Sequence, residues 1–180
     1  MNKNIKEVLS WVGIVALGVA AALLLNRYVI YKAIVPTGSM EKTIMPGDHV
    51  FGLRIFSDIK RGNIVIFPSE KYLGTDDGNY VKRVIGLPGE KLEISDGTVY
   101  VDGKALKEDY LPEEMYGDWG PYEVPEDCYF LLGDNRNGSG DARFWQVKYV
   151  EKDDIIAVVK FRYWPLNRFK FFETPKYDLE

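Results

Sequence analysis

Near the N-terminus runs an uninterrupted apolar stretch, and it constrains the fold more than any other feature of the chain. Residues 8–25 carry no charge, and apart from Ser10 and two glycines all of them are clearly apolar. As a helix these 18 residues extend to about 27 Å, close to the roughly 30 Å hydrocarbon core of a bilayer. Tyr28 and Tyr31 follow where an interfacial aromatic belt is expected. The sequence therefore predicts one membrane-spanning helix.

A cleaved signal peptide is the competing interpretation of this stretch. Lys3 and Lys6 form a basic region in front of it, and the three alanines at 20–22 could serve as a cleavage site. The apolar run continues beyond them through residues 23–25, so cleavage there would fall inside the run. A retained anchor is therefore favoured.

The orientation of the anchor is less strongly marked. Basic residues lie on both sides of the apolar run, so the positive-inside rule barely decides. Residues 1–32 carry a net charge of +3, which leaves −7 on residues 33–180 of a chain whose formal net charge is −4. We expect residues 1–32 to be a cytoplasmic tail and anchor, and residues 33–180 an extracytoplasmic domain of a single-pass protein in the cell membrane.

The residues after the anchor predict a mainly β domain. Breaker residues separate short runs rich in Val, Ile, Tyr and Phe, which is typical of strands joined by tight turns. The expected strands cover residues 48–55, 62–67, 80–85, 91–94, 98–101, 128–132 and 155–163. Their spacing indicates a small barrel or a sandwich of antiparallel sheets. Residues 106–127 hold eight acids, one base and three prolines, so we expect an irregular acidic excursion on the surface there.

Composition argues against several kinds of site. The acidic charge of residues 33–180 disfavours nucleic acid as a partner. His49 and Cys128 are the only histidine and cysteine, so the sequence contains no metal-spaced cluster and no pair for an internal disulfide. We expect neither a metal nor another cofactor.

Residues 36–40, Pro-Thr-Gly-Ser-Met, place a serine shortly after the apolar run. The Ser39 hydroxyl needs a base to remove its proton, and three residues are candidates for that base. His49 would give a Ser-His-Asp arrangement, but its position in an expected strand is typical of an exposed residue. Lys42 completes a bare Ser-x-x-Lys pattern, but it lies beside Glu41, in polar surroundings that do not lower a lysine pKa.

Lys82 is the third candidate. A strand over residues 80–85 would place it among apolar neighbours, and burial disfavours the ammonium, which lowers a lysine pKa towards the range that a general base needs. From these residues alone, an exposed lysine on an amphipathic strand is the simpler interpretation.

Three motifs in order change this balance. They are Pro-Thr-Gly-Ser-Met at 36–40, Tyr-Val-Lys-Arg-Val-Ile-Gly-Leu-Pro-Gly-Glu at 80–90, and Gly-Asp-Asn-Arg-Asn-Gly-Ser-Gly-Asp-Ala-Arg at 133–143. From the anchor to about residue 165, the chain closely resembles the bacterial type I signal peptidases, in the short single-anchor form of Gram-positive bacteria. The resemblance implies an all-β catalytic domain on the outer membrane face, a Ser-Lys dyad, and removal of signal peptides from exported proteins.

The resemblance also implies a role for each matching residue. Ser39 would be the nucleophile and Lys82 the general base, while the backbone N–H of Ser39 and the hydroxyl of Thr37 would hold the oxyanion. Ser139 would orient Lys82, and Met40 would shape the pocket for the residue before the cut. The supporting scaffold would consist of Arg83, Asp134, Arg136, Asp141 and Arg143, the last two as an ion pair. The family often has proline three residues after the nucleophile, where this chain has Lys42.

The expected partners are the signal peptides of exported preproteins and the membrane lipid. Residues 160–172 mix aromatic with basic side chains, and we expect either contact with anionic lipid or a last strand with a packed tail. Two other functions stay open: a Ser-Lys self-cleaving protease of the related repressor fold, and a membrane-anchored binding module without activity.

Overall fold

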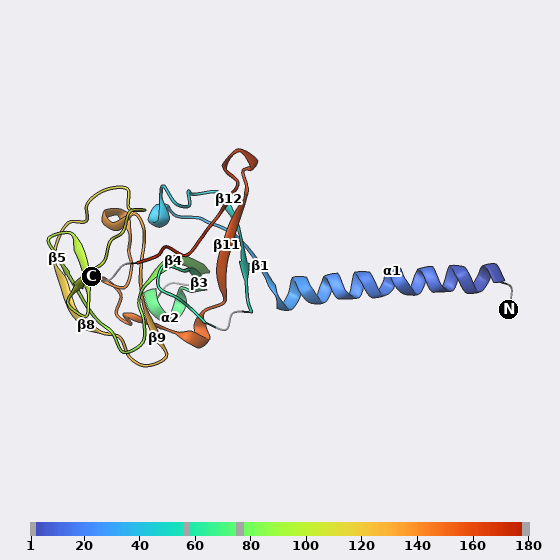
Figure 1. The fold of residues 1–180 in the computed structure, drawn as a ribbon, viewed down its shortest axis with the longest axis horizontal. Helices are drawn as coiled ribbons and strands as arrows, with labels where there is room; N and C mark the ends of the chain where they lie inside the picture. Colours follow the sequence, from blue (N-terminus) through green and yellow to red (C-terminus); the bar gives the residue numbers. More distant parts are fainter. Residues whose placement is uncertain (1–2, 56–57, 75–77, 178–180) are drawn as a thin grey trace.

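One long helix and a β domain make up the computed structural model, which describes residues 3–55, 58–74 and 78–177 (Figure 1). Helix α1 spans Lys3–Tyr28; its C-terminal end lies next to strand β1, and its N-terminal end points away from the domain. Its stretch Leu9–Tyr28 has a mean hydropathy of 2.1, and none of it is buried within the protein. By length and composition this helix can cross a membrane.

The described part of the domain consists of two antiparallel sheets, and all seven expected strands are present. The larger sheet contains β1 (Ile30–Ile34), β2 (His49–Leu53), β3 (Ile64–Pro68), β4 (Asn79–Gly86), β9 (Cys128–Leu132), β10 (Tyr149–Glu151), β11 (Ala157–Trp164) and β12 (Lys170–Phe171). The smaller sheet contains β5 (Lys91–Ser95), β6 (Thr98–Val101), β7 (Lys104–Ala105) and β8 (Trp119–Glu123). Its strands β5 and β8 lie at the end of the domain opposite the helix (Figure 1).

Within the described residues, the connections contain five short helices. They are η1 (Gly38–Met40), α2 (Glu70–Leu73), η2 (Arg136–Gly138), η3 (Lys152–Asp154) and η4 (Leu166–Arg168). Two of them, η1 and η2, fall in the motifs that contain Ser39 and Ser139, so both motifs adopt compact turns rather than strands.

The larger sheet is open, so the expectation of a small barrel is wrong while that of paired antiparallel sheets is confirmed. Its order is β1-β2-β11-β3-β4-β9-β10, with β12 added beside β11. Among the described residues, β1 pairs only with β2 and β10 pairs only with β9. A barrel needs its two edge strands to join, and this sheet leaves both edges unpaired.

Two clusters of buried side chains cover opposite faces of the larger sheet. Along β3, Val65 and Phe67 enter the cluster shared with the smaller sheet, whereas Ile64 and Ile66 enter the second cluster. This alternation is what a strand buried on both faces requires. The second cluster also contains Met40, so the turn after β1 is held against this face of the sheet.

The acidic segment, residues 106–127, is more ordered than a surface excursion. It contains β8, which pairs with β5. Four of its apolar side chains are buried in the core: Leu106, Met115, Tyr122 and Val124. Most of its carboxylates remain on the surface, and Glu108 is the exception described below.

Candidate active site

Ser39 lies in η1, in a turn held by the loop of residues 133–143. The residue is 8% exposed. Its carbonyl accepts the N–H of Asn135 at 3.1 Å, and the Asn135 side chain donates to the carbonyl of Gly38, also at 3.1 Å. The hydroxyl of Ser39 lies 3.3 Å from that of Thr37, which is in extended conformation before the turn. The serine is therefore fixed on its backbone side while its hydroxyl faces Thr37.

Lys82 is fully buried in the middle of β4. Its neighbour Val81 packs into the cluster that contains Met40, so alternation sends Lys82 to the opposite face of the strand. There its Nζ donates to the hydroxyl of Ser139 at 3.1 Å. Burial lowers the pKa of Lys82 from its ordinary 10.5 to about 8, against the opposing effect of Asp141.

Gly133 brings the serine turn and the lysine partner together. A side chain on Gly133 would place its Cβ 2.4 Å from the carbonyl oxygen of Ser39 and 2.2 Å from the hydroxyl of Ser139. Only glycine leaves room for both groups. The Ser39 turn and the hydrogen-bond partner of Lys82 thus lie against the same glycine, and β4 also contacts η1. The described hydrogen bonds include Lys82 to Ser139 and Ser39 to Thr37, and none from Lys82 to the Ser39 hydroxyl.

Buried ion pairs hold the loop of residues 133–143. Arg83, next to Lys82, donates from Nε and Nη2 to the two carboxylate oxygens of Asp134 at 2.7 and 2.6 Å. Arg143 makes the corresponding pair with Asp141 at 2.7 and 2.9 Å. All four side chains are at most 4% exposed. Such bidentate pairs fix both position and orientation.

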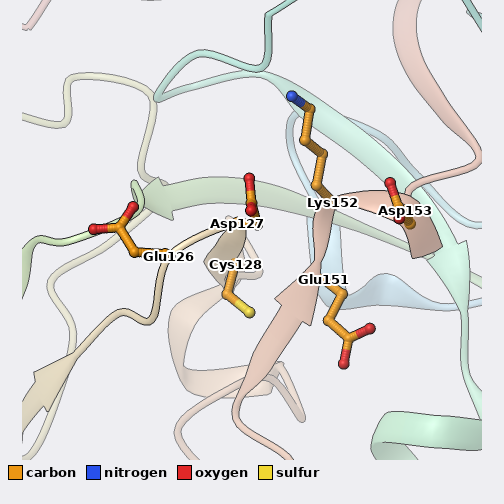
Figure 2. Close-up of a pocket in the computed structure, with 6 residues that line it drawn as sticks. All are labelled: Glu126, Asp127, Cys128, Glu151, Lys152 and Asp153. Carbon is orange, nitrogen blue, oxygen red and sulfur yellow. The ribbon is translucent and has the colours of Figure 1, made fainter.

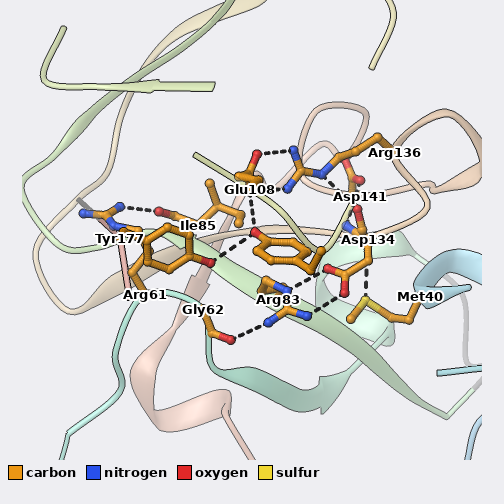
Figure 3. Close-up of polar contacts among 12 residues, drawn as sticks. Met40, Arg61, Gly62, Arg83, Ile85, Glu108, Asp134, Arg136, Asp141 and Tyr177 are labelled. Carbon is orange, nitrogen blue, oxygen red and sulfur yellow. Dashed lines mark hydrogen bonds and ion pairs between the residues drawn. The ribbon is translucent and has the colours of Figure 1, made fainter. Parts of the chain in front are cut away.

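Met40 also takes part in this framework. It is fully buried, and its sulfur accepts the backbone N–H of Asp134 at 3.4 Å (Figure 3). Met40, the residue after Ser39, is thereby linked to Asp134, the residue after Gly133. The scaffold residues described so far therefore lie in, or bind to, the loop that contains Ser139.

Arg136 has a partner that the sequence did not indicate. Its guanidinium, 0% exposed, donates to Gly133 at 3.0 Å and to both carboxylate oxygens of Glu108 at 2.8 and 2.6 Å (Figure 3). Glu108 belongs to the acidic segment, whose composition gives no sign that one of its eight acids is buried. Asn135 was missed as well, although it stands inside the third motif.

The two other candidate bases lie elsewhere. Lys42 is exposed, and its Nζ donates to the carbonyl of Pro112 at 3.2 Å. Its φ of +69° is closed to proline, so a proline at this position would need a different turn. His49 lies in β2 with its ring 5.6 Å from that of Tyr163. No described contact joins either residue to the Ser39 hydroxyl.

A separate pocket of about 500 Å³ lies between the start of β9 and the end of β10. Figure 2 shows the carboxylates of Glu126 and Glu151 pointing away from each other, with the Cys128 sulfur between the two strands. Among the described residues, no group of three or more His, Cys, Asp or Glu side chains could hold a metal ion. The pocket is not part of the serine and lysine site.

The sequence matches the family described as signal peptidase, peptidase S26, over residues 8–164. The chain belongs to this signal peptidase family. Signal peptidase I of Leptolyngbya laminosa is 35% identical over 161 residues, which cover 86% of this chain and 78% of the relative. Signal peptidase I of Bacillus licheniformis is 32% identical over 182 residues, covering 94% and 95%. A crystal structure of a signal peptidase I from Enterococcus faecalis is 33% identical, with a TM-score of 0.49 over 58% of this chain and 98% of that one.

As a member of the signal peptidase family, the protein is a serine endopeptidase that removes signal peptides. Its relatives include signal peptidases of Gram-positive bacteria, as the single anchor predicted. The apolar helix α1 agrees with membrane anchoring. The alternative of a self-cleaving repressor gains no support.

Proposed function

We propose that Ser39 and Lys82 form the catalytic dyad of this signal peptidase. The neutral amine of Lys82 accepts the proton of the Ser39 hydroxyl as its oxygen attacks the carbonyl carbon of the scissile bond. The resulting ammonium then protonates the leaving amine, and the acyl-enzyme is hydrolysed by water with Lys82 again as the base. Rotation of the Ser39 hydroxyl from Thr37 towards Lys82 precedes the attack.

One observation carries this proposal: Lys82 is wholly buried, with a pKa of about 8, and its hydrogen-bond partner Ser139 packs against Gly133, as the carbonyl of Ser39 does. A lysine with an ordinary pKa would be protonated at neutral pH and could not accept the proton. The burial that lowers its pKa is therefore what qualifies Lys82 as the base.

The other site residues support this dyad in distinct ways. The hydroxyl of Thr37 and the backbone N–H of Ser39 stabilise the oxyanion, each contributing about 3 kcal/mol in the transition state. Ser139 orients the amine of Lys82. Met40 positions the nucleophile and shapes the pocket for a small side chain before the cut. The ion pairs keep the loop in place through Arg83, Asp134, Arg136, Asp141 and Arg143.

The substrate binds as an extended strand between β1 and β4. Among the described residues, β1 pairs on one side only, with β2, and residues 79–82 of β4 pair only with β3. The two strands approach each other at one point, where the Asn79 side chain donates to the hydroxyl of Tyr31. Free strand edges bind extended peptides through backbone hydrogen bonds. A signal peptide entering here reaches Ser39 at the far end of β1.

Helix α1 anchors the protein with its N-terminus in the cytoplasm and residues 30–177 outside, where exported preproteins emerge. A test compares Glu93→Cys with Glu7→Cys, both in a Cys128→Ser background, by labelling spheroplasts with a membrane-impermeant maleimide. We expect labelling of Glu93→Cys alone, and labelling of Glu7→Cys alone would reverse the orientation.

The β11–β12 hairpin contacts the lipid surface. Of its basic residues, Arg162 and Arg168 pair with the buried Asp48, while Lys160 and Lys170 stay exposed. Large apolar side chains around them are also exposed, at Trp164, Leu166, Phe169 and Phe171. In a Trp11→Phe background, brominated lipid should quench part of the tryptophan fluorescence, and this quenching should be lost when Trp164→Phe is added. Equal quenching with and without Trp164 would contradict lipid contact.

The dyad is tested with a preprotein that has small residues before its cut site. Ser39→Ala and Lys82→Ala should each abolish cleavage, and Lys42→Ala, which removes an exposed lysine three residues from the serine, should retain it. Activity of Lys82→Ala with loss in Lys42→Ala would show that the dyad is wrong. Activity in neither Ser39→Ala nor the unmodified protein would favour a binding module.

A further inference from the structure

The acidic segment contacts both halves of the candidate site. Its Glu108 binds Arg136, in the loop that contains Ser139. Its Pro112 carbonyl accepts the Lys42 ammonium at 3.2 Å, three residues after Ser39. The Asn137 side chain adds bonds of 2.9–3.0 Å to residues 113, 114 and 116 of the segment. The acidic segment therefore contacts both the turn after Ser39 and the loop of residues 133–143, which contains Ser139.

Glu108 is the buried centre of these contacts. Its side chain is 5% exposed and faces an Arg136 guanidinium that is 0% exposed (Figure 3). The hydroxyl of Tyr110 also donates to Glu108, and burial raises the pKa of Tyr110 so that this hydroxyl keeps its proton. The Tyr110 ring in turn lies 4.0 Å from the guanidinium of Arg83, and its hydroxyl accepts a bond from Tyr177 at 3.1 Å.

A continuous path leads from Glu108 to the lysine. Arg136 donates to the Gly133 carbonyl at 3.0 Å, and the Gly133 N–H donates to Asp141 at 3.1 Å. The backbone carbonyl of Arg136 accepts Arg143, which closes the loop on itself. Ser139 lies within this closed loop and accepts the bond from Lys82.

We propose that Glu108 is a positioning residue for catalysis: by holding Arg136, it keeps the Ser139 loop closed over Lys82. This role rests on the proposed Ser39–Lys82 dyad. An Arg136 without its carboxylate is a buried charge lacking its partner, and Asp134 is the next acid that attracts it. Competition with Arg83 for Asp134 then loosens the loop, and water reaches Lys82.

The test measures kcat, KM and the pH profile of preprotein cleavage by the full chain in detergent. Glu108→Gln keeps the shape and removes the charge, and Asp109→Asn is the matched control because that side chain is 80% exposed. We expect Glu108→Gln to lower kcat roughly 10- to 100-fold with KM almost unchanged, since none of the described hydrogen bonds or ion pairs joins Glu108 to β1 or to residues 79–82. Water that reaches Lys82 should raise its pKa, so the acid limb of the pH profile should move to higher pH. Asp109→Asn should change neither.

A double-mutant cycle separates positioning from general loss of structure. If Glu108 acts through Arg136, Glu108→Gln combined with Arg136→Gln should be no less active than Arg136→Gln alone. Additive losses, a rise in KM alone, or an unshifted pH limb would overturn the proposal. Should Glu108→Gln fail to fold, Asn137→Ala weakens the same attachment at an exposed site, and an unchanged kcat there would count against it.

Ser39→Ala is measured alongside. If Ser39→Ala still cleaves, the dyad fails and the role of Glu108 fails with it. If Ser39→Ala is inactive while Glu108→Gln behaves as Asp109→Asn does, the dyad stands and only the role of Glu108 is overturned.

Discussion

The turn after Ser39 and the middle of β4 each present a lysine, and their surroundings differ in every respect that matters for a base. Lys42 is three residues from Ser39, exposed, and bound to a backbone carbonyl. Lys82 is far from Ser39 in sequence but fully buried, bound to a serine hydroxyl, and has a lowered pKa. Closeness in the chain therefore says little about which lysine can act, because desolvation decides whether its amine is free of a proton.

The pH profile gives the largest effect that this comparison predicts. Cleavage should rise as Lys82 loses its proton, with an apparent pKa of about 8. At pH 6, two pH units below this pKa, only about 1% of Lys82 is deprotonated. The cleavage rate there should therefore be roughly 100-fold below its plateau. Lys42→Ala should leave this limb where it is. A flat profile from pH 6 to 10, with chemistry rate-limiting, would break the comparison.

Replacing Lys82 should abolish activity but increase the stability of the fold, whereas replacing Lys42 should change neither by much. The folded pKa of Lys82 is depressed, so below about pH 8 its buried ammonium destabilises the fold, and this penalty fades as pH rises towards 10.5. Lys82→Met should be inactive yet raise the free energy of unfolding at pH 7 by up to about 3 kcal/mol. Lys42→Met should change it by less than about 0.5 kcal/mol. Urea unfolding at pH 7 and pH 10 measures both, and a destabilised Lys82→Met at pH 7 would contradict the expectation.

Removing the partner of Lys82 sharpens the comparison further. Ser139→Ala deletes the hydroxyl that orients the amine and should lower kcat roughly 10-fold, with little effect on KM. Ser95→Ala, at the end of β5 in the smaller sheet, is the control and should retain full activity. Equal rates for the two variants would show that Ser139 does not orient the base.

The smallest effect is expected at Lys42 itself. Its φ of +69° is strained for any residue with a side chain. Lys42→Gly should therefore raise the free energy of unfolding by about 0.5 kcal/mol or leave it unchanged, because relief of strain offsets the greater freedom of the unfolded chain. Cleavage should stay within about 2-fold, since no transition-state contact is lost. A pronounced loss of activity would mean that this turn does more than connect η1 to β2.

Local patterns in the sequence were sufficient for the helix and for most strands. The uncharged apolar run at 8–25 and the strand at 80–85, which is rich in Val, Ile and Tyr, are each recognisable from their own residues. β8 was missed because Trp119–Glu123 includes Gly120 and Pro121, which resemble a turn until β5 supplies the pairing. Barrel closure could not be judged, since it depends on whether two distant edge strands meet.

The features of the site also divide into those that local patterns in the sequence predicted and those that only the folded chain shows. The three motifs located every residue of the expected scaffold, and the structure brings these residues together. The burial of Lys82 was not readable from β4 alone, because its cover comes from a loop about fifty residues later. Glu108 was out of reach for the same reason: the pairing of one acid among eight with Arg136 depends on the folded chain and leaves no local signature.

A single residue, Val29, separates the end of α1 from the start of β1. With so short a connection, a domain whose helix lies in a bilayer cannot drift away from the surface. Enzyme and membrane-borne substrate then meet in two dimensions, and their encounter rate depends on molecules per unit area of membrane rather than per volume of buffer. Diluting proteoliposomes that contain both should leave the cleavage rate per vesicle unchanged, whereas adding protein-free lipid that fuses with them should slow it.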